Sequence, residues 1–278
     1  MVGTSILILG GLSLAFAVLL AFAARFFTVS EDPLVAKIEE LLPGSNCGGC
    51  GAAGCRALAE LLAARKVDPG ICVASNAETN AKIAALTGQS VNLVEKRVAV
   101  LRCQGGRSRV KERFRYTGIP TCTVANLTAG GPKECLYGCL GYGDCLRACP
   151  FGAISLGEEG LPVIDEAKCV ACGRCVAACP RRLVTLISRR QWTYVACSSR
   201  NKGKTVKDAC PVGCIACGLC AKVTKSGAIV IEDNLPRMNY EKGQDFEEAV
   251  KRCPMHCFVV RFTPRTSSDA GSEPAAKA

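Results

Sequence analysis

The sequence is poor in the residues that build large hydrophobic cores. The chain has 278 residues but one tryptophan, and the aromatic residues together make up 5% of it. The apolar fraction of 49% includes 21 cysteines, so it overstates the apolar surface available for packing. Stretches of roughly 50 to 80 residues seldom bury enough apolar surface to fold securely alone. We therefore expect metals or inorganic clusters to supply part of the stability.

The sequence also lacks the usual signatures of a catalytic or nucleotide-binding site. Its one histidine, His256, belongs to no acid–base constellation, and we assign it a surface or hydrogen-bonded role. Glycine pairs such as Gly105-Gly106 do not stand in the strand, G-x-G-x-x-G, helix context that binds dinucleotides. We therefore expect no NAD site and no substrate site on this chain.

The basic charge balance is not accompanied by the residues that bind nucleic acid. The formal net charge is +11 with every cysteine counted as neutral, and basic residues do not interleave with aromatic ones. A cubane iron–sulfur cluster with four thiolates carries a charge of roughly −2, so several clusters would cancel most of the excess. We read the basic residues as compensation for buried cluster charge and expect no nucleic-acid partner.

The cysteines are spaced like iron–sulfur ligands. Cys169, Cys172, Cys175 and Cys179-Pro180 have the C-x2-C-x2-C-x3-C-P spacing of a bacterial ferredoxin. A secreted disulfide scaffold is the other class with so many cysteines, but it does not need this run. Iron–sulfur thiolates also belong in a reducing compartment. The spacing therefore predicts clusters rather than disulfides.

In such ferredoxin runs the fourth cysteine ligates the other cluster, which implies two cubanes within residues 135–180. One predicted ligand set is Cys149, Cys169, Cys172 and Cys175. The other group is irregular, because Tyr142 stands where the middle cysteine belongs, and we take Cys135 as its substitute. The second predicted set is Cys135, Cys139, Cys145 and Cys179.

A separate four-cysteine site is expected nearer the N-terminus. Its cysteines are Cys47, Cys50, Cys55 and Cys72, in the spacing C-x2-C-x4-C-x16-C. Glycines within this loop let the backbone wrap a cluster closely, and residues 56–66 are predicted to form an amphipathic helix that returns the chain to Cys72. Four thiolates can also bind zinc, which is the alternative at this site.

Residues 210–257 repeat the central module in eroded form. Thr224 takes the place of Cys149, and Gly243, Phe246 and Ala249 take the places of three further ligands. The losses remove the ligands of one cluster and leave a complete set for the other. That set is Cys214, Cys217, Cys220 and Cys253, and it brings the expected total to four [4Fe-4S] clusters.

Five cysteines are left over by these assignments. Cys197, Cys210 and Cys257 are predicted to be packing residues. Cys103 and Cys122 stand alone in the segment between the first site and the central module, and they are left unassigned. Isolated cysteines are more often small buried hydrophobes than ligands.

The first 24 residues contain no charge and are long enough, as a helix of about 36 Å, to cross a bilayer core of about 30 Å. A cleaved signal peptide is the alternative, weakened by the missing basic n-region. Arg25 follows at once and the basic body lies beyond it, so the positive-inside rule predicts a single-pass protein of the inner membrane with its soluble part in the cytoplasm.

The predicted fold class is α+β, with one transmembrane helix, a small iron–sulfur domain and ferredoxin-like modules. The expected divisions are an anchor at 1–27, the four-cysteine domain at 28–90, a connecting segment with a strand at 91–134, a two-cluster module at 135–190, a one-cluster module at 191–263 and a disordered tail at 264–278.

This order of motifs resembles the B subunit of the Rnf electron-transport complex. The most specific pieces are Cys47 to Cys55 with Cys72, and the run Gly130 to Cys139, which looks like the longer, clostridial-type form. The resemblance implies electron transfer between reduced ferredoxin and NAD, coupled to sodium or proton translocation. It also implies the other subunits of the complex, soluble ferredoxin and the bilayer as partners. Departures from the longer form at Thr224, Gly243, Phe246 and Ala249 bear on the cluster count.

Two other functions are compatible with the same residues. One is the iron–sulfur subunit of a different membrane reductase, which would need a substrate site that the sequence does not contain. The other is a metal-stabilised membrane scaffold without a redox role. Iron with matching sulfide, and absorbance bleached by dithionite, would favour the electron-transfer function over the scaffold.

Overall fold

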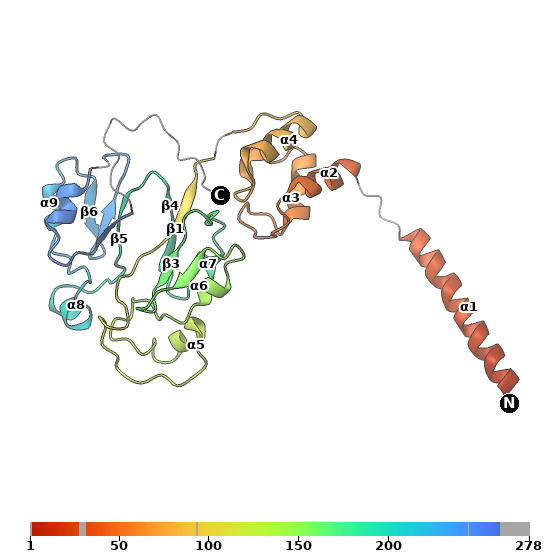
Figure 1. Cartoon of the computed structure of the whole chain (residues 1–278), viewed down its shortest axis with the longest axis horizontal. Coiled ribbons are helices and arrows are strands. Elements are labelled where there is room, and N and C mark those ends of the chain that lie inside the picture. The colour runs from red at the N-terminus through yellow and green to blue at the C-terminus, as the bar shows by residue number, and fades with distance from the viewer. Residues whose placement is uncertain (1, 28–31, 93, 244, 262–278) are drawn as a thin grey trace.

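The computed structural model describes residues 2–27, 32–92, 94–243 and 245–261. It confirms a mixed fold in which helices and short antiparallel strand pairs follow one another along the chain. A long helix extends from a body made of one helical domain and two strand-containing modules (Figure 1). The predicted tail at 264–278 lies outside the described residues.

Helix α1 (Val2–Phe26) stands clear of the rest of the molecule (Figure 1). Its 25 residues span about 37 Å. The segment Gly3–Phe26 has a mean hydropathy of 2.6 and none of it is buried inside the protein. Large apolar side chains such as Leu7 and Phe22 are therefore exposed all along the helix. By length and composition, α1 is a candidate membrane span.

A small helical domain follows. It comprises α2 (Pro33–Leu41), α3 (Cys55–Ala63), the short 3-10 helix η1 (Pro69–Ile71) and α4 (Ala77–Thr87). Asp32 begins α2 by accepting a hydrogen bond from the Leu34 amide at 2.8 Å, and Asn76 begins α4 in the same manner. Four large side chains are fully buried between these helices: Ile38, Leu58, Leu62 and Ile83. This small core positions the cysteine loop that precedes α3.

The central module is closed by its first and last strands. Strand β1 (Arg97–Leu101) pairs antiparallel with β4 (Val184–Ser188), with Ala99 opposite Leu186. Between them lie α5 (Cys122–Leu127), α6 (Asp144–Arg147), the hairpin β2 (Ile154–Leu156) with β3 (Pro162–Ile164), and α7 (Arg174–Ala178). The predicted strand of the connecting segment is therefore part of the central sheet.

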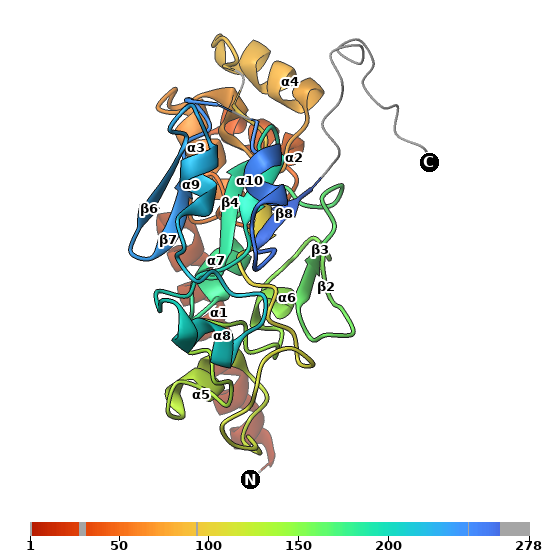
Figure 2. The ribbon, with the colours of Figure 1, turned by 90° about the vertical axis from the view of Figure 1, so that its left-hand side faces the viewer.

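The C-terminal module repeats this plan. Strand β5 (Thr193–Val195) pairs antiparallel with β8 (Phe258–Val260). Between them lie α8 (Lys204–Ala209), α9 (Leu219–Val223), the hairpin β6 (Ile229–Glu232) with β7 (Leu235–Met238), and α10 (Glu247–Lys251). Figure 2 shows the β6–β7 hairpin at the left of the view and β2–β3 at the right. The two modules thus follow the same order of elements.

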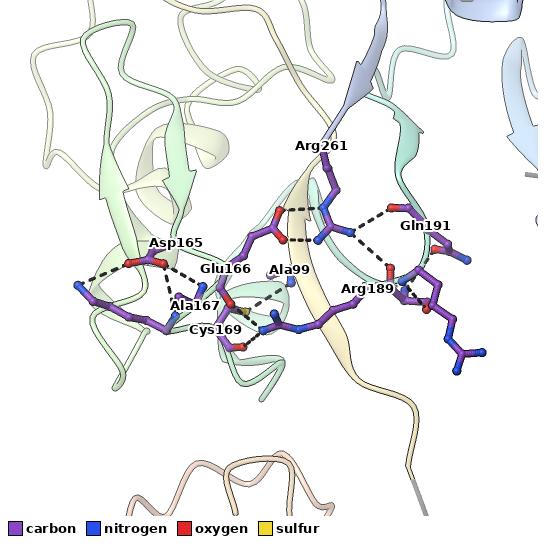
Figure 3. Close-up of polar contacts among 11 residues, drawn as sticks. Ala99, Asp165, Glu166, Ala167, Cys169, Arg189, Gln191 and Arg261 are labelled. Atoms are coloured by element: carbon purple, nitrogen blue, oxygen red, sulfur yellow. Dashed lines mark hydrogen bonds and ion pairs between the residues drawn. The ribbon is translucent and has the colours of Figure 1, made fainter. Parts of the chain in front are cut away.

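An arginine cluster joins the end of the C-terminal module to the central one (Figure 3). Arg261, which directly follows β8, forms an ion pair with Glu166 and donates a hydrogen bond to the Gln191 carbonyl at 3.0 Å. Arg189 donates to the carbonyls of Glu166 and Cys169, at 2.6 and 3.0 Å. The same cluster therefore braces the loop that carries Cys169.

Candidate metal centres

The N-terminal cysteines lie on a loop held against the small helical core. Asn46 closes this loop, because its side-chain oxygen accepts a hydrogen bond from the amide of Cys55 at 2.7 Å. Gly48 and Gly51 have φ of 73° and 88°, a region that glycine enters without strain. Cys50, Cys55 and Cys72 pack on the core of this domain. The loop that also carries Cys47 is thereby wrapped around one end of α3.

The second group of cysteines surrounds a hollow in the central module. Its four cysteines are Cys149, Cys169, Cys172 and Cys175, and its walls are apolar, with side chains from β1 and β4. The Ala99 amide points at the Cys169 sulfur, 3.5 Å away (Figure 3). Burial raises the pKa of Cys175 to about 12, so its thiol is protonated until a metal displaces the proton.

The third group differs from the predicted one. The hollow beside Leu101 and Leu183 is lined by Cys122, Cys139, Cys145 and Cys179. Cys135 does not line it, and Cys122, which the spacing left unassigned, does. The reason is local, since the carboxylate of Asp144 accepts hydrogen bonds from the amides of Cys122 and Thr123, both at 2.9 Å. That contact fixes the first turn of α5 beside the hollow.

Burial dominates the chemistry of these thiols. It raises the pKa of Cys139 to about 12 and that of Cys145 to about 11. Tyr142, at the position of the missing middle cysteine, is turned toward Tyr116, with the two ring centroids 5.6 Å apart. The ring therefore contacts the segment that leads into α5 and Cys122.

The fourth group lies in the C-terminal module, where Cys214, Cys217, Cys220 and Cys253 line one hollow together with Cys257. The sulfurs of Cys253 and Cys257 are 3.4 Å apart. Burial raises the pKa of Cys220 to about 11. The predicted set is thus brought together, and the additional cysteine lies in the wall beside it.

The positions of the lost ligands in this module are filled by packing. Phe246 is 3% exposed and Ala249 is 1% exposed, and both belong to the core of the module. Tyr240 packs edge-on against Phe246 at a centroid distance of 5.5 Å. Thr224 donates its hydroxyl hydrogen to the Cys220 carbonyl at 2.8 Å. The space of a second cluster is therefore occupied by protein.

Four cysteines remain, and they also lie together. Cys103, Cys135, Cys197 and Cys210 line a hollow between the central and C-terminal modules. Burial raises the pKa of Cys197 to about 11 and also raises those of Cys135 and Cys210. The spacing gave no sign of this grouping, because its members lie far apart in the chain. His256, in contrast, is exposed.

The donor sets suit clusters better than single ions. Within the described ranges, no three Cys, His, Asp or Glu side chains converge on a point that one metal ion could occupy. Four thiols around a hollow fit a cubane instead, since each thiolate then binds a different iron at a separate corner. The buried thiols supply the sulfur ligands, and the apolar walls keep water away from the hollow.

Two family models match the cysteine-rich regions. Residues 42–74 match a putative Fe-S cluster domain, and residues 134–183 match a 4Fe-4S dicluster domain. The first match covers all four N-terminal cysteines, and the second covers the ferredoxin run. Iron–sulfur clusters, including the [4Fe-4S] type, are thus supported independently of the pocket geometry.

Three relatives, each the B subunit of a membrane complex, align with most of the chain. That of the Na(+)-translocating ferredoxin:NAD(+) oxidoreductase complex of Acetobacterium woodii is 42% identical over 90% of this chain and 75% of its own. That of the ion-translocating oxidoreductase complex of Methanosarcina acetivorans is 40% identical over 92% and 97%. That of the proton-translocating ferredoxin:NAD(+) oxidoreductase complex of Clostridium ljungdahlii is 42% identical over 87% of both. The chain therefore belongs to the family of B subunits of ion-translocating ferredoxin:NAD(+) oxidoreductase complexes, as its motifs predicted, and is an iron–sulfur electron-transfer subunit.

Proposed function

We propose that this chain carries electrons between soluble ferredoxin and the other subunits of an ion-translocating ferredoxin:NAD(+) oxidoreductase complex. The carriers are [4Fe-4S] clusters at an N-terminal, two central and one C-terminal site. The proposed ligand sets are Cys47, Cys50, Cys55 and Cys72; Cys149, Cys169, Cys172 and Cys175; Cys122, Cys139, Cys145 and Cys179; and Cys214, Cys217, Cys220 and Cys253. Cys122 replaces the Cys135 of the sequence-based set.

The observation that carries this proposal is that complete sets of four thiols surround separate hollows. When bound, the clusters supply one-electron redox chemistry. The protein excludes water with apolar walls and directs amide hydrogens at the thiolate sulfurs. Ala99 donates to Cys169 at 3.5 Å, and Leu183 donates to Cys179 at 3.3 Å. Such hydrogen bonds stabilise the ionised sulfur and shift the potential of a cluster.

Contact between neighbouring sites supports a relay. A Cβ atom added at Gly49 would lie 2.8 Å from the Cα atom of Cys172, so the N-terminal loop touches the second hollow. The second and third hollows share one module, and helices α6 and α7 of that module contact each other. NAD binds to another subunit in this proposal, because this chain offers no dinucleotide fingerprint.

The membrane arrangement follows from α1 and its flank. We propose that α1 crosses the inner membrane once and that everything after it lies in the cytoplasm, since Arg25 and the basic body follow the apolar span. Ferredoxin is a cytoplasmic carrier, so it would reach the clusters from this side. A reporter fused after Ala278 should behave as cytoplasmic, and a periplasmic signal would contradict this orientation.

The deciding experiment is anaerobic purification from membranes. The chain should co-purify with the other subunits, contain iron with equal sulfide, and show visible absorbance that reduced ferredoxin bleaches as dithionite does. Zinc in place of iron would favour the metal-stabilised scaffold. Iron that reduced ferredoxin cannot reduce would point to a different membrane reductase.

A further inference from the structure

Four cysteines outside the sixteen proposed ligands meet at the junction of the two modules. The central module contributes Cys103, which follows the end of β1 by two residues, and Cys135. The C-terminal module contributes Cys197, which follows the end of β5 by two residues, and Cys210, which follows α8. A Cβ atom added at Gly105 would lie 3.4 Å from the Cys210 sulfur and 3.7 Å from the Cys103 sulfur. Sulfurs from both modules therefore approach one place.

The two halves of this junction are built alike. Residues 135–139 and 210–214 share the pattern C-x2-G-C, and in each the glycine amide donates to the carbonyl of the first cysteine, at 3.1 and 3.2 Å. In each, the first cysteine lines the junction hollow and the last one lines the hollow of its own module. Each pattern thus joins the junction to a neighbouring site.

The hydrogen bonds to sulfur repeat as well. The amide of Cys139 donates to the Cys103 sulfur at 3.3 Å, and the amide of Cys214 donates to the Cys197 sulfur, also at 3.3 Å. Packing alone gives no reason for both modules to direct an amide at the cysteine after the first strand. Thiolate ligands do give one, because N–H donors stabilise their negative charge.

The charges around the hollow favour an anionic occupant. Lys133 is 3% exposed and is the one charged side chain among the fully buried residues of the described ranges. Its ammonium donates to the Gly105 carbonyl at 2.8 Å, and Arg181 donates to the Cys135 carbonyl at 3.2 Å. Within those ranges no carboxylate forms an ion pair with Lys133. A buried cation needs a compensating anion, and a cubane with four thiolates carries a charge of roughly −2.

We propose that Cys103, Cys135, Cys197 and Cys210 hold a fifth [4Fe-4S] cluster, shared equally by the two modules. This inference rests on the proposed function in that it assumes a chain loaded with clusters. The site lies between the third and fourth hollows and contacts both through Cys139 and Cys214. It therefore continues the relay, and a single electron passing along it leaves one cluster oxidised as the next is reduced. Of the 21 cysteines, Cys257 is the one without a proposed ligand role.

The test is an iron and sulfide count on the full chain, purified anaerobically in detergent. We expect about twenty irons and twenty sulfides per chain, compared with about sixteen for four clusters. Cys210→Ser and Cys197→Ser should each lose about four irons. The reduced variants should give an electron paramagnetic resonance signal with one spin fewer and with the remaining clusters intact. Val110→Ala is the matched control, because Val110 lines the same hollow without a thiol and should lose no iron.

The outcomes separate this inference from the function on which it rests. About sixteen irons in the unsubstituted chain, unchanged in both cysteine variants, would overturn the fifth site and leave the proposed function standing. One zinc per chain, lost in the same variants, would also overturn it. A chain without iron would overturn the proposed function itself. The count on the unsubstituted chain decides the matter even where a variant fails to fold.

Discussion

The carboxylate of Asp144 accepts a hydrogen bond from the backbone amide of Cys122 at 2.9 Å. The two residues belong to different helices, α6 and α5, and this contact brings Cys122 to a hollow whose other cysteines come from later in the chain. Asp144 also accepts from Thr123, through both its amide and its hydroxyl. The position of one proposed ligand thus depends on a carboxylate that binds no metal.

Replacing Asp144 by alanine should loosen the third site. Loss of the hydrogen bonds to this carboxylate is expected to lower the free energy of unfolding by about 1.5–3 kcal/mol. Iron should be released to a chelator faster than from the unsubstituted protein, by an amount close to one cluster. Asp144→Asn retains an acceptor and should fall between the two. Glu78→Ala, at an exposed ion pair in α4, serves as the control, and equal release from both alanine variants would contradict the role of Asp144.

Cys257 and Cys253 should behave differently despite sulfurs that lie 3.4 Å apart. Cys257 occupies the position of Leu183 in the repeat, and Leu183 forms a wall of the third hollow. Cys257→Ala should therefore keep all its iron. In that background, Cys253→Ala should lose about four irons. Loss of a cluster from Cys257→Ala alone would instead identify Cys257 as a ligand.

The ferredoxin run and its crossover could be predicted because spacing carries the information. A short loop followed by a helix sets the relative positions of Cys169, Cys172 and Cys175, and the repeat places Cys253 with Cys214. The fold class and the family resemblance were confirmed for the same reason. The burial of Phe246 also agrees with the expectation that packing fills the eroded half.

The positions of Cys122 and Cys103 could not be predicted in this way. Cys122 reaches its hollow through a helix pinned by Asp144, which lies more than twenty residues away and leaves no trace in the spacing. Cys103 and Cys197 each follow the first strand of a module, and they meet only where the two modules pack together. A signal did exist in the sequence, namely the C-x2-G-C pattern that occurs at both Cys135 and Cys210.

Gly49→Ala should separate the N-terminal site from the central module. The added Cβ would lie 2.7 Å from a methyl carbon of Val73 and 2.8 Å from the Cα atom of Cys172, so one surface must move. Such overpacking costs about 1–3 kcal/mol. We expect unchanged iron but a weaker magnetic interaction between the two reduced clusters. Gly11→Ala, where nothing lies within 4 Å, is the control, and an unchanged interaction in Gly49→Ala would show that the two sites are not in contact.

The ion pair between Arg261 and Glu166 should stabilise the junction of the modules. The Arg261 side chain is 4% exposed, so Arg261→Ala removes a charge-assisted contact from the interior and should cost about 1.5–3 kcal/mol. The expected result is a lower melting temperature and faster proteolysis between the modules. Lys168→Ala removes a neighbouring exposed pair and should cost at most about 1 kcal/mol. Equal shifts for both variants would refute the role of Arg261.

Each module closes with its last strand, since β1 pairs with β4 and β5 with β8. During synthesis, β1 leaves the ribosome long before its partner, so the central module stays open while most of its cysteines are already available. Cofactor delivery can then precede closure of the sheet. The junction must wait longer, because two of its four cysteines belong to the second module. The order of translation therefore sets an order of maturation, from the N-terminal loop to the boundary between the modules.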